Sequence, residues 1–381
     1  MDQDTITLQL HNWLQRPSPR RSTHILDDLP ISIASDIGTR REENQDRAVL
    51  LRAQVSKAKA FVVGVLCDGM GGMSDGSKCA SLAISVFLSS CIRNRSMNIE
   101  DRIKKAVLEA DKAVYAQYQG NGGSTLSAFI FDSDGNSISI NVGDSRIYCQ
   151  LKNGKFEQLS VDDTIAGQLK QQEVASSFNN NLIQYIGMGS DIEPHIIKLP
   201  NTSNIQKLLL TSDGVHYIPS QTLSSLVSQN ISPIELSKRL IDVSNWCGGH
   251  DNATALVTIE PSTLFHFGKN TPTGTLHLCD YNSDVFLIGI EKAQPTEVPD
   301  INAKHNLQNL SPSEVEGEHL NKEVVPEKAN SEPQPDGLEN KSEKKKAPRK
   351  RANSKAKKTD DDNADASDDE QKPQLRMDFD D

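Results

Sequence analysis

The chain has 381 residues, a formal net charge of −11 and a pI near 5.4, so it is not a molecule that binds nucleic acid over its whole surface. Its six cysteines contain no C-x-x-C pair, which argues against a zinc ribbon or redox motif and favours reduced, buried thiols. No run approaches the roughly 20 apolar residues of a membrane helix, and residues 1–14 lack a signal pattern. The sequence therefore predicts a cytoplasmic protein with no membrane partner.

The N-terminal part is predicted to be a leader, residues 1–24, that precedes the first strand. Apolar side chains at residues 8–14 have the spacing of a short amphipathic contact, and two prolines among the arginines of residues 16–21 indicate a break. Ile31–Ser35 alternates between apolar and polar residues, and Ala48–Leu51 is strand-like. The polar turn between them is rich in charged and amide side chains.

The most informative stretch is the apolar run Phe61–Cys67, which has the length and composition of a strand buried on both faces. It ends on Asp68, and a cluster of glycines follows. A charge at the mouth of a buried strand is costly unless it is compensated, and a metal ion is the usual partner of a carboxylate there. Glycines let the backbone turn sharply and bring a carbonyl close to a ligand.

The same design recurs along the chain. An apolar strand leads to Asp213-Gly214, an alternating strand leads to Gly143-Asp144, and Asp251 precedes the strand-like run Ala253–Ile259. A single Asp-Gly after a strand is typical of a simple turn. Four carboxylates at strand mouths together favour a metal site.

The remaining elements complete an α+β layered fold rather than a dinucleotide-binding one. Helices are predicted over 77–92, 99–118 and 233–246, an antiparallel meander over 125–132, 137–142 and 146–151, and further strands over 195–199, 208–211, 253–259, 276–278 and 285–288. Residues 161–181 are polar and glutamine-rich, which predicts a mobile segment with at most a short helix.

The candidate ligands Asp68, Asp213 and Asp251 form an all-oxygen set, which favours Mg²⁺ or Mn²⁺ over zinc or copper. Two ions that share Asp68 would hold a bridging water as hydroxide, a nucleophile at neutral pH. Phosphoryl transfer suits such a site, because its transition state requires charge neutralisation and alignment. Arg41, with the adjacent Arg40 as the alternative, is predicted to bind two phosphate oxygens.

In chain order the motifs are GTRREENQD, CDGMGG, GGSTL, VGDSRIY, TSDGV and GGHDNAT. Together they resemble the metal-dependent type 2C (PPM-type) protein serine/threonine phosphatases in their bacterial form, over residues 35–260. The resemblance implies a four-layer α/β/β/α sandwich of two antiparallel sheets flanked by helices. It also implies a catalytic domain over residues 25–262, and residues 263–290 are predicted to be its C-terminal extension.

The resemblance implies a role for each matched residue. Asp68 matches the carboxylate that bridges both ions, Gly69 matches the carbonyl ligand of the second ion, and Asp213 and Asp251 match the other ligands of the first ion. Asp46 matches the acid that holds metal-bound water, and Asp144 with Asp213 matches the site of a weaker third ion. Arg41 matches the phosphate-binding arginine.

Two positions depart from the pattern. Met70 stands where many eukaryotic members carry a histidine proposed as general acid, so leaving-group protonation would fall to metal-bound water. The segment after Asp162-Asp163-Thr164 corresponds to the family's flap and is glutamine-rich, so substrate preference does not carry over. His216 and His250 lie near site motifs, but no spacing supports a ligand role for either.

The C-terminal residues 291–381 are predicted to be a disordered tail, with a basic block at 341–358 and an acidic block at 360–370. Its tip, residues 375–381, has the composition of a docking peptide or of a solvated end. The tail also has the charge to fold back on the acidic metal cleft and regulate it.

The leading hypothesis is an enzyme that hydrolyses phosphoserine and phosphothreonine on proteins, the substrates of a partner kinase, with two Mn²⁺ or Mg²⁺ ions. The alternatives are a catalytically weak, phosphatase-like binding or scaffold module, and a hydrolase of small phosphoesters or nucleic acid. The basic block is the feature that favours nucleic acid, but it lies far from the catalytic motifs and the acidic block offsets it.

Overall fold

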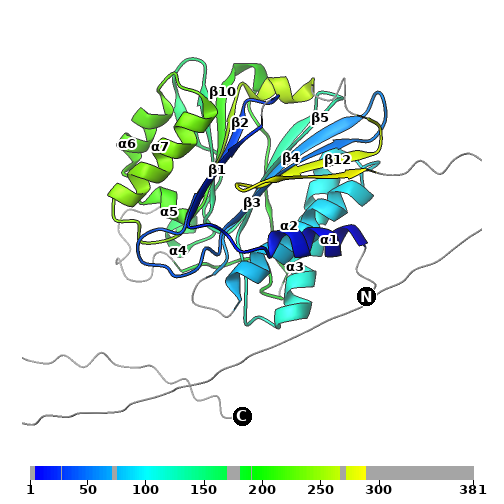
Figure 1. The fold of residues 1–381 in the computed structure, drawn as a ribbon, viewed down its shortest axis with the longest axis horizontal. Coiled ribbons are helices and arrows are strands. Elements are labelled where there is room, and N and C mark those ends of the chain that lie inside the picture. Colours follow the sequence, from blue (N-terminus) through cyan, green and yellow to red (C-terminus); the bar gives the residue numbers. More distant parts are fainter. Residues whose placement is uncertain are drawn as a thin grey trace, which may run out of the picture. The chain divides into compact units, whose positions relative to one another are not determined.

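Two antiparallel β-sheets lie face to face, and helices cover the outer face of each sheet (Figure 1). The computed structural model describes residues 5–26, 28–70, 75–169, 181–189, 191–266 and 272–288. This four-layer arrangement confirms the predicted α/β/β/α sandwich. The predicted tail, and residues 170–180 of the predicted flap, lie outside the described residues.

The six-stranded sheet has the order β1-β2-β11-β10-β7-β8. Its strands are β1 (Arg21–Ile25), β2 (Ile31–Asp36), β7 (Arg146–Leu151), β8 (Phe156–Gln158), β10 (Ile205–Thr211) and β11 (Ala253–Ile259). The seven-stranded sheet has the order β13-β12-β3-β4-β5-β6-β9. Its strands are β3 (Arg47–Gln54), β4 (Ala60–Cys67), β5 (Leu126–Asp132), β6 (Ser137–Val142), β9 (His195–Ile197), β12 (Thr275–Cys279) and β13 (Asp284–Ile288).

The central strands are buried on both faces, as the apolar run in β4 predicts. Val63 and Val65 of β4 pack toward the helices, whereas Val62 and Leu66 belong to the core between the two sheets. This two-sided burial leaves no place for a charge along the strand. Polar chemistry is therefore confined to the loops at the strand ends.

Helices α1 (Thr5–Leu14), α2 (Gly76–Arg93) and α3 (Ile99–Tyr118) pack with the seven-stranded sheet, and α6 (Ser220–Val227) and α7 (Pro233–Trp246) pack on the six-stranded sheet. Short helices α4 (Ile165–Leu169) and α5 (Asp213–His216) and 3₁₀ turns η1 (Thr202–Asn204) and η2 (Pro261–Phe265) lie in connections. The start of α7 is fixed by a capping box, in which the Ser232 hydroxyl accepts from the Glu235 N–H and the Glu235 carboxylate accepts from the Ser232 N–H. Among the described helices, none is long and apolar enough to cross a membrane.

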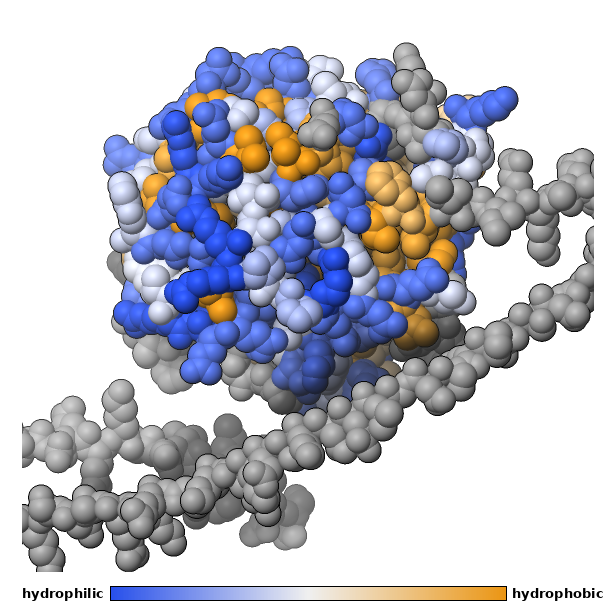
Figure 2. All heavy atoms as spheres, viewed as in Figure 1, coloured by the Kyte–Doolittle hydropathy of each residue, from blue (hydrophilic) through white to orange (hydrophobic). Residues whose placement is uncertain are grey.

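The predicted leader is more structured than its sequence indicates. It contains helix α1, whose Leu10 and Leu14 are buried against α2, and strand β1, which pairs along β2. Figure 2 shows apolar side chains gathered on the face where α1 and β12 lie, around a groove of about 360 Å³ that includes Ile6, Leu276 and Leu287.

The predicted meander is wrong at its last step. Strand β6 pairs with β5 and β9, whereas β7 belongs to the other sheet and pairs with β10 and β8. The chain crosses between the sheets at Gly143, which has a φ of +97° and approaches Thr125 so closely that a Cβ would lie 2.7 Å from its methyl group. The alternation of residues identifies the strands but not the sheet to which each belongs.

Candidate active site

Five carboxylates meet at one end of the sandwich, where loops from both sheets converge. Asp46 precedes β3, Asp68 follows β4, Asp144 lies in the crossing from β6 to β7, Asp213 opens α5 after β10, and Asp251 precedes β11. The negative charges of the other four all raise the pKa of Asp68, after the larger effect of its burial. The structure thus brings together the five carboxylates that the sequence singles out.

Burial and mutual repulsion raise the pKa of four of these acids in the absence of a cation. Burial raises the pKa of Asp213 to about 8, and the charges of Asp251 and Asp144 add to the effect. The pKa of Asp46 rises to about 6, mainly through burial, while its hydrogen bond with Ser212 acts in the opposite direction. Burial, followed by the charge of Asp162, raises the pKa of Asp144 to about 6.

Two carboxylate oxygens in this cluster, Asp46 Oδ1 and Asp213 Oδ1, are buried and have no hydrogen-bond partner. A buried acceptor without a donor costs about 1–3 kcal/mol, and native structures rarely keep one without a reason. A hard divalent cation would coordinate both oxygens and neutralise the repulsion among the carboxylates. The all-oxygen donor set therefore fits Mg²⁺ or Mn²⁺.

The loop that carries Asp68 is anchored through its backbone, which leaves its carboxylate to face the cluster. The N–H of Asp68 donates to the Thr125 hydroxyl at 2.9 Å, and its carbonyl accepts from the Thr125 N–H and the Ser124 hydroxyl, each at 2.9 Å. Gly69 cannot be replaced without strain, because a Cβ there would lie 2.3 Å from the carbonyl oxygen of Gly76.

Two polar side chains that the sequence analysis did not select hold this end together. Ser212 donates to Asp46 Oδ2 at 2.7 Å, and its oxygen accepts from the Thr254 N–H at 2.9 Å. Asn252 accepts from the Gln45 N–H at 2.8 Å and donates to the carbonyls of Ile37 and Glu43 at 2.9 and 3.0 Å. Both stand beside an aspartate in the motifs TSDGV and GGHDNAT, and that position was the available signal.

Arg41 is the cation at the mouth of the cluster. Its guanidinium donates to Asp251 Oδ2 at 2.6 Å, and its side chain is 40% exposed. That hydrogen bond, with the charges of Asp213 and Asp68, raises the pKa of Arg41. Both adjacent arginines are exposed, and it is Arg41 that makes this contact.

A cleft of about 670 Å³ opens beside Asp144 and Asp213. Its other lining residues include Arg146, Asp162, Thr164, Gly167, His216 and Tyr217, so the described part of the predicted flap, with helix α4, forms one wall. Arg146 donates to both oxygens of Asp162, with the shortest contact at 2.6 Å, and this bidentate pair stiffens the wall.

The two nearby histidines make contacts with their protein neighbours. His216 Nε2 is hydrogen-bonded to the Thr211 hydroxyl at 2.7 Å, and burial lowers its pKa well below the usual range. The ring of His250 packs edge-on against Tyr217, with ring centres 5.8 Å apart. That neither histidine is a metal ligand stays a prediction from the absence of ligand spacing.

The comparison that decides the family is a match between residues 39–258 and the profile described as Protein phosphatase 2C. The chain belongs to the protein phosphatase 2C family. The match covers more than half of the chain and includes all five carboxylates and Arg41.

Several phosphatases resemble this chain. A putative protein phosphatase 2C-type of Streptococcus pyogenes serotype M6 is 25% identical over 243 residues, which cover 59% of this chain and 95% of that protein. The structure of a PPM Ser-Thr phosphatase from Mycobacterium smegmatis in complex with cacodylate is 25% identical, with a TM-score of 0.50, and the match covers 60% of this chain and 96% of that one. The catalytic domain of the phosphatase PstP in complex with two manganese ions is also 25% identical, with a TM-score of 0.50 and 62% and 97% coverage.

Proposed function

We propose that this member of the protein phosphatase 2C family is an active metal-dependent protein serine/threonine phosphatase, which hydrolyses phosphoserine and phosphothreonine. The observation that carries the proposal is the cluster of buried carboxylates with unpartnered oxygens on Asp46 and Asp213. A binding module that had lost catalysis would have no reason to keep this costly arrangement. Family membership and the similar phosphatase with two manganese ions support the same reading.

In this proposal two Mn²⁺ or Mg²⁺ ions are held by Asp68, Asp213, Asp251, Asp46 and the carbonyl of Gly69, and a weaker third ion by Asp144 with Asp213. Bound ions would supply charge neutralisation at the phosphate and an activated water as the nucleophile. The chain itself provides alignment. Ser212 holds the carboxylate of Asp46 in one orientation through its 2.7 Å hydrogen bond, which fixes where a water bound to Asp46 lies.

Arg41 would bind the substrate phosphate. Its exposed side chain pairs with Asp251, and a phosphate carries more charge and offers two oxygens to the guanidinium fork. Binding would therefore move Arg41 from Asp251 to the phosphate, and Asp251 would then face only the ions. The phosphorylated segment of the substrate protein would lie in the cleft between Asp144 and the flap.

The test is hydrolysis of p-nitrophenyl phosphate and of a phosphothreonine peptide, with and without Mn²⁺, by wild type, Asp213→Asn and Asp134→Asn. Asp134 is an exposed carboxylate in the β5–β6 turn and serves as the matched control. We expect metal-dependent turnover that falls about 100-fold or more in Asp213→Asn, because several kcal/mol of charge stabilisation are lost, and that is unchanged in Asp134→Asn. Absence of turnover by intact, metal-loaded wild type would overturn the enzyme proposal in favour of a binding module.

A further inference from the structure

A second group of ligand-type side chains lies outside the residues that match the family. It consists of His24 in β1, Cys279 at the end of β12 and Asp284 at the start of β13. One ligand atom from each residue lies within 4.8 Å of those from the other two. The family match begins at residue 39 and ends at residue 258, so all three residues lie outside the matched range.

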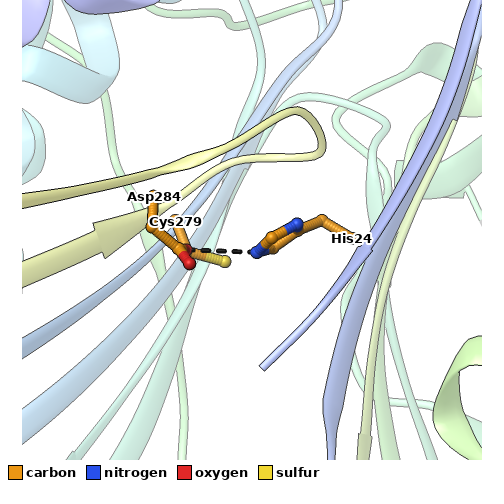
Figure 3. A group of neighbouring side chains, drawn as sticks. All are labelled: His24, Cys279 and Asp284. Atoms are coloured by element: carbon orange, nitrogen blue, oxygen red, sulfur yellow. Dashed lines mark hydrogen bonds and ion pairs between the residues drawn. The ribbon is translucent and has the colours of Figure 1, made fainter. Parts of the chain in front are cut away.

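Strand register explains why the three side chains meet. Cys279 and Asp284 are direct partners across the β12–β13 hairpin, so both side chains are on the same face of that hairpin. Strand β1 is at the edge of the six-stranded sheet and β13 is at the edge of the seven-stranded sheet. Figure 3 shows the His24 ring pointing from its strand across the open edge of the sandwich toward the two hairpin residues.

The distances and burial suit a small ion with access from solvent. His24 Nε2 and Asp284 Oδ1 are 3.1 Å apart, close to the separation of about 3.4 Å expected between two ligands of a tetrahedral zinc ion. Cys279 is fully buried, whereas the side chains of His24 and Asp284 are 25% and 36% exposed. The buried sulfur closes one side, and the two partly exposed ligands leave room for water as a fourth ligand.

A fourth residue, His277, provides an independent indication. It is 9% exposed, its ring is stacked on Phe286 with centres 4.1 Å apart, and its Nε2 has no hydrogen-bond partner. That nitrogen lies 3.4 Å from Asp284 Oδ1, near enough for an ion pair but not in line for a hydrogen bond. Metal-binding carboxylates are commonly oriented by an outer partner of this kind, and a shift of Asp284 toward an ion would leave its other oxygen for His277.

The neighbouring charges are already compensated. Arg52, which approaches His277 Nδ1 at 3.5 Å, is paired with both oxygens of Asp28, and Asp280 is paired with Arg16 at 2.7 Å. The Cys279 thiol donates a weak hydrogen bond to the Asp280 carbonyl at 3.8 Å and also interacts with the Asp284 carboxyl group. Burial, with the charges of Asp284 and Asp280, raises the pKa of this thiol, so without a metal it is neutral and unreactive.

We propose that His24, Cys279 and Asp284 form a binding site for a divalent transition metal ion, of which Zn²⁺ fits best, and that the ion fastens the β12–β13 hairpin to β1. Nitrogen, sulfur and oxygen ligands together favour zinc, whereas Mg²⁺ and Mn²⁺ favour the all-oxygen cluster at the active site. On binding, the Cys279 S–H bond breaks, a sulfur–metal bond forms and the proton passes to solvent. The chain would thus bind Zn²⁺ at one site and Mg²⁺ or Mn²⁺ at the other, because the ligand atoms of the two sites differ.

The test uses Co²⁺ as a spectroscopic substitute for zinc, added to the full chain in the presence of excess Mg²⁺. A thiolate-to-cobalt charge-transfer band is expected in wild type and in Cys149→Ser, and it should be absent in Cys279→Ser. Cys149 is the matched control, because it is also a buried thiol beside a carboxylate, Glu157, at 3.7 Å. Lack of the band in wild type, or its survival in Cys279→Ser, would overturn the proposal.

A second variant tests the site even if Cys279→Ser does not fold. His24→Ala changes a partly exposed side chain on an edge strand, and it should weaken Zn²⁺ binding at least 10-fold in calorimetric titration under the same excess of Mg²⁺. Zinc should raise the unfolding temperature of wild type and leave that of His24→Ala unchanged. Equal zinc affinity in the two proteins would contradict the assignment.

Discussion

At the scale of single residues, the active site is a set of acids that repel one another in the absence of metal. The folded-state pKa values of Asp213, about 8, and of Asp46, about 6, both exceed the ordinary value of an unfolded aspartate. At any pH between the unfolded and the folded pKa of these acids, the folded metal-free chain binds more protons than the unfolded chain. The stabilisation that follows is complete below the unfolded pKa and disappears as the pH rises through the folded pKa.

The metal-free protein is therefore expected to lose stability between pH 5 and pH 8. The free energy of unfolding should fall by about 1.4 kcal/mol per pH unit for each proton by which the folded state exceeds the unfolded state. Urea unfolding of protein treated with a chelator, measured at both pH values, checks the slope. Asp213→Asn should flatten it, because the amide does not titrate, and a wild-type slope of the opposite sign would contradict the pKa assignment.

Ser212 is a positioning residue whose effect is separable from stability. Its hydroxyl donates to Asp46 Oδ2 at 2.7 Å, so Ser212→Ala removes that hydrogen bond from a buried carboxylate whose Oδ1 already lacks a partner. We expect about 10–100-fold weaker activation by Mn²⁺, the usual effect of removing an outer partner of a metal ligand. The measurement is the Mn²⁺ concentration dependence of p-nitrophenyl phosphate hydrolysis.

The matched control for Ser212→Ala is Ser225→Ala, which removes an exposed hydroxyl that donates to the Gln221 carbonyl of its own helix. If Ser212→Ala lowered the unfolding temperature but kept the metal dependence of wild type, Ser212 would have a structural role alone.

At the scale of elements, the decisive connection is the crossing from β6 to β7, which carries Asp144 between the sheets. Alternating residues predicted both strands to within a residue, but predicted the wrong partner for β7, because pairing depends on contacts that are distant in sequence. The crossing is held by Asp163, a fully buried carboxylate. It accepts from the Gly143 N–H at 2.8 Å and is paired with His195 Nε2 at 2.7 Å.

Asp163→Asn is expected to loosen this crossing. The amide oxygen can still accept from the Gly143 N–H while its NH₂ group faces His195 Nε2, but both contacts lose the carboxylate acceptor, at a cost of about 1–3 kcal/mol. Urea unfolding should show this loss, while Asp134→Asn in the exposed turn should remain within about 0.5 kcal/mol of wild type. Equal stability of the two variants would show that the crossing is held by its backbone alone.

At the scale of the whole molecule, the sequence predicted what is encoded locally. The buried strand β4, helices α3 and α7 and four of the strand-end aspartates follow from runs of neighbouring residues, whereas Asp46 was selected through the family resemblance. The place of β12 beside β3, and the meeting of β1 with the β12–β13 hairpin, depend on segments at opposite ends of the domain. Because no local pattern encodes such a contact, the sequence does not predict that His24 lies beside Cys279 and Asp284.

The β12–β13 hairpin contacts the backbone beside the active site, so its removal is expected to affect that site. Tyr281, in the hairpin turn, is 3% exposed and donates to the carbonyl of Asp46 at 3.3 Å, and Arg47 approaches the same hydroxyl at 3.4 Å. Strand β12 also covers the edge of β3 along five residue pairs and buries Leu278. The hairpin is thus part of the seven-stranded sheet and supports the backbone beside a predicted metal ligand.

Two truncated chains test the role of the hairpin separately from the role of the residues after it. A chain that ends at residue 290 keeps every described element, and it should match the full chain in unfolding temperature and in p-nitrophenyl phosphate turnover. A chain that ends at residue 266 loses the burial of Leu278, Cys279 and Tyr281, each worth about 2 kcal/mol, which corresponds to an unfolding temperature lower by about 10–20 °C.

The outcomes of these truncations discriminate between roles. Equal unfolding temperatures of the two shortened chains would show that the hairpin is a dispensable appendage. A large change in small-substrate turnover on removal of residues 291–381 alone would mean that the tail acts on the active site rather than only docking partners. Because p-nitrophenyl phosphate needs no docking surface, an unchanged rate with this substrate and a slower rate with a phosphoprotein would assign the tail to substrate recruitment.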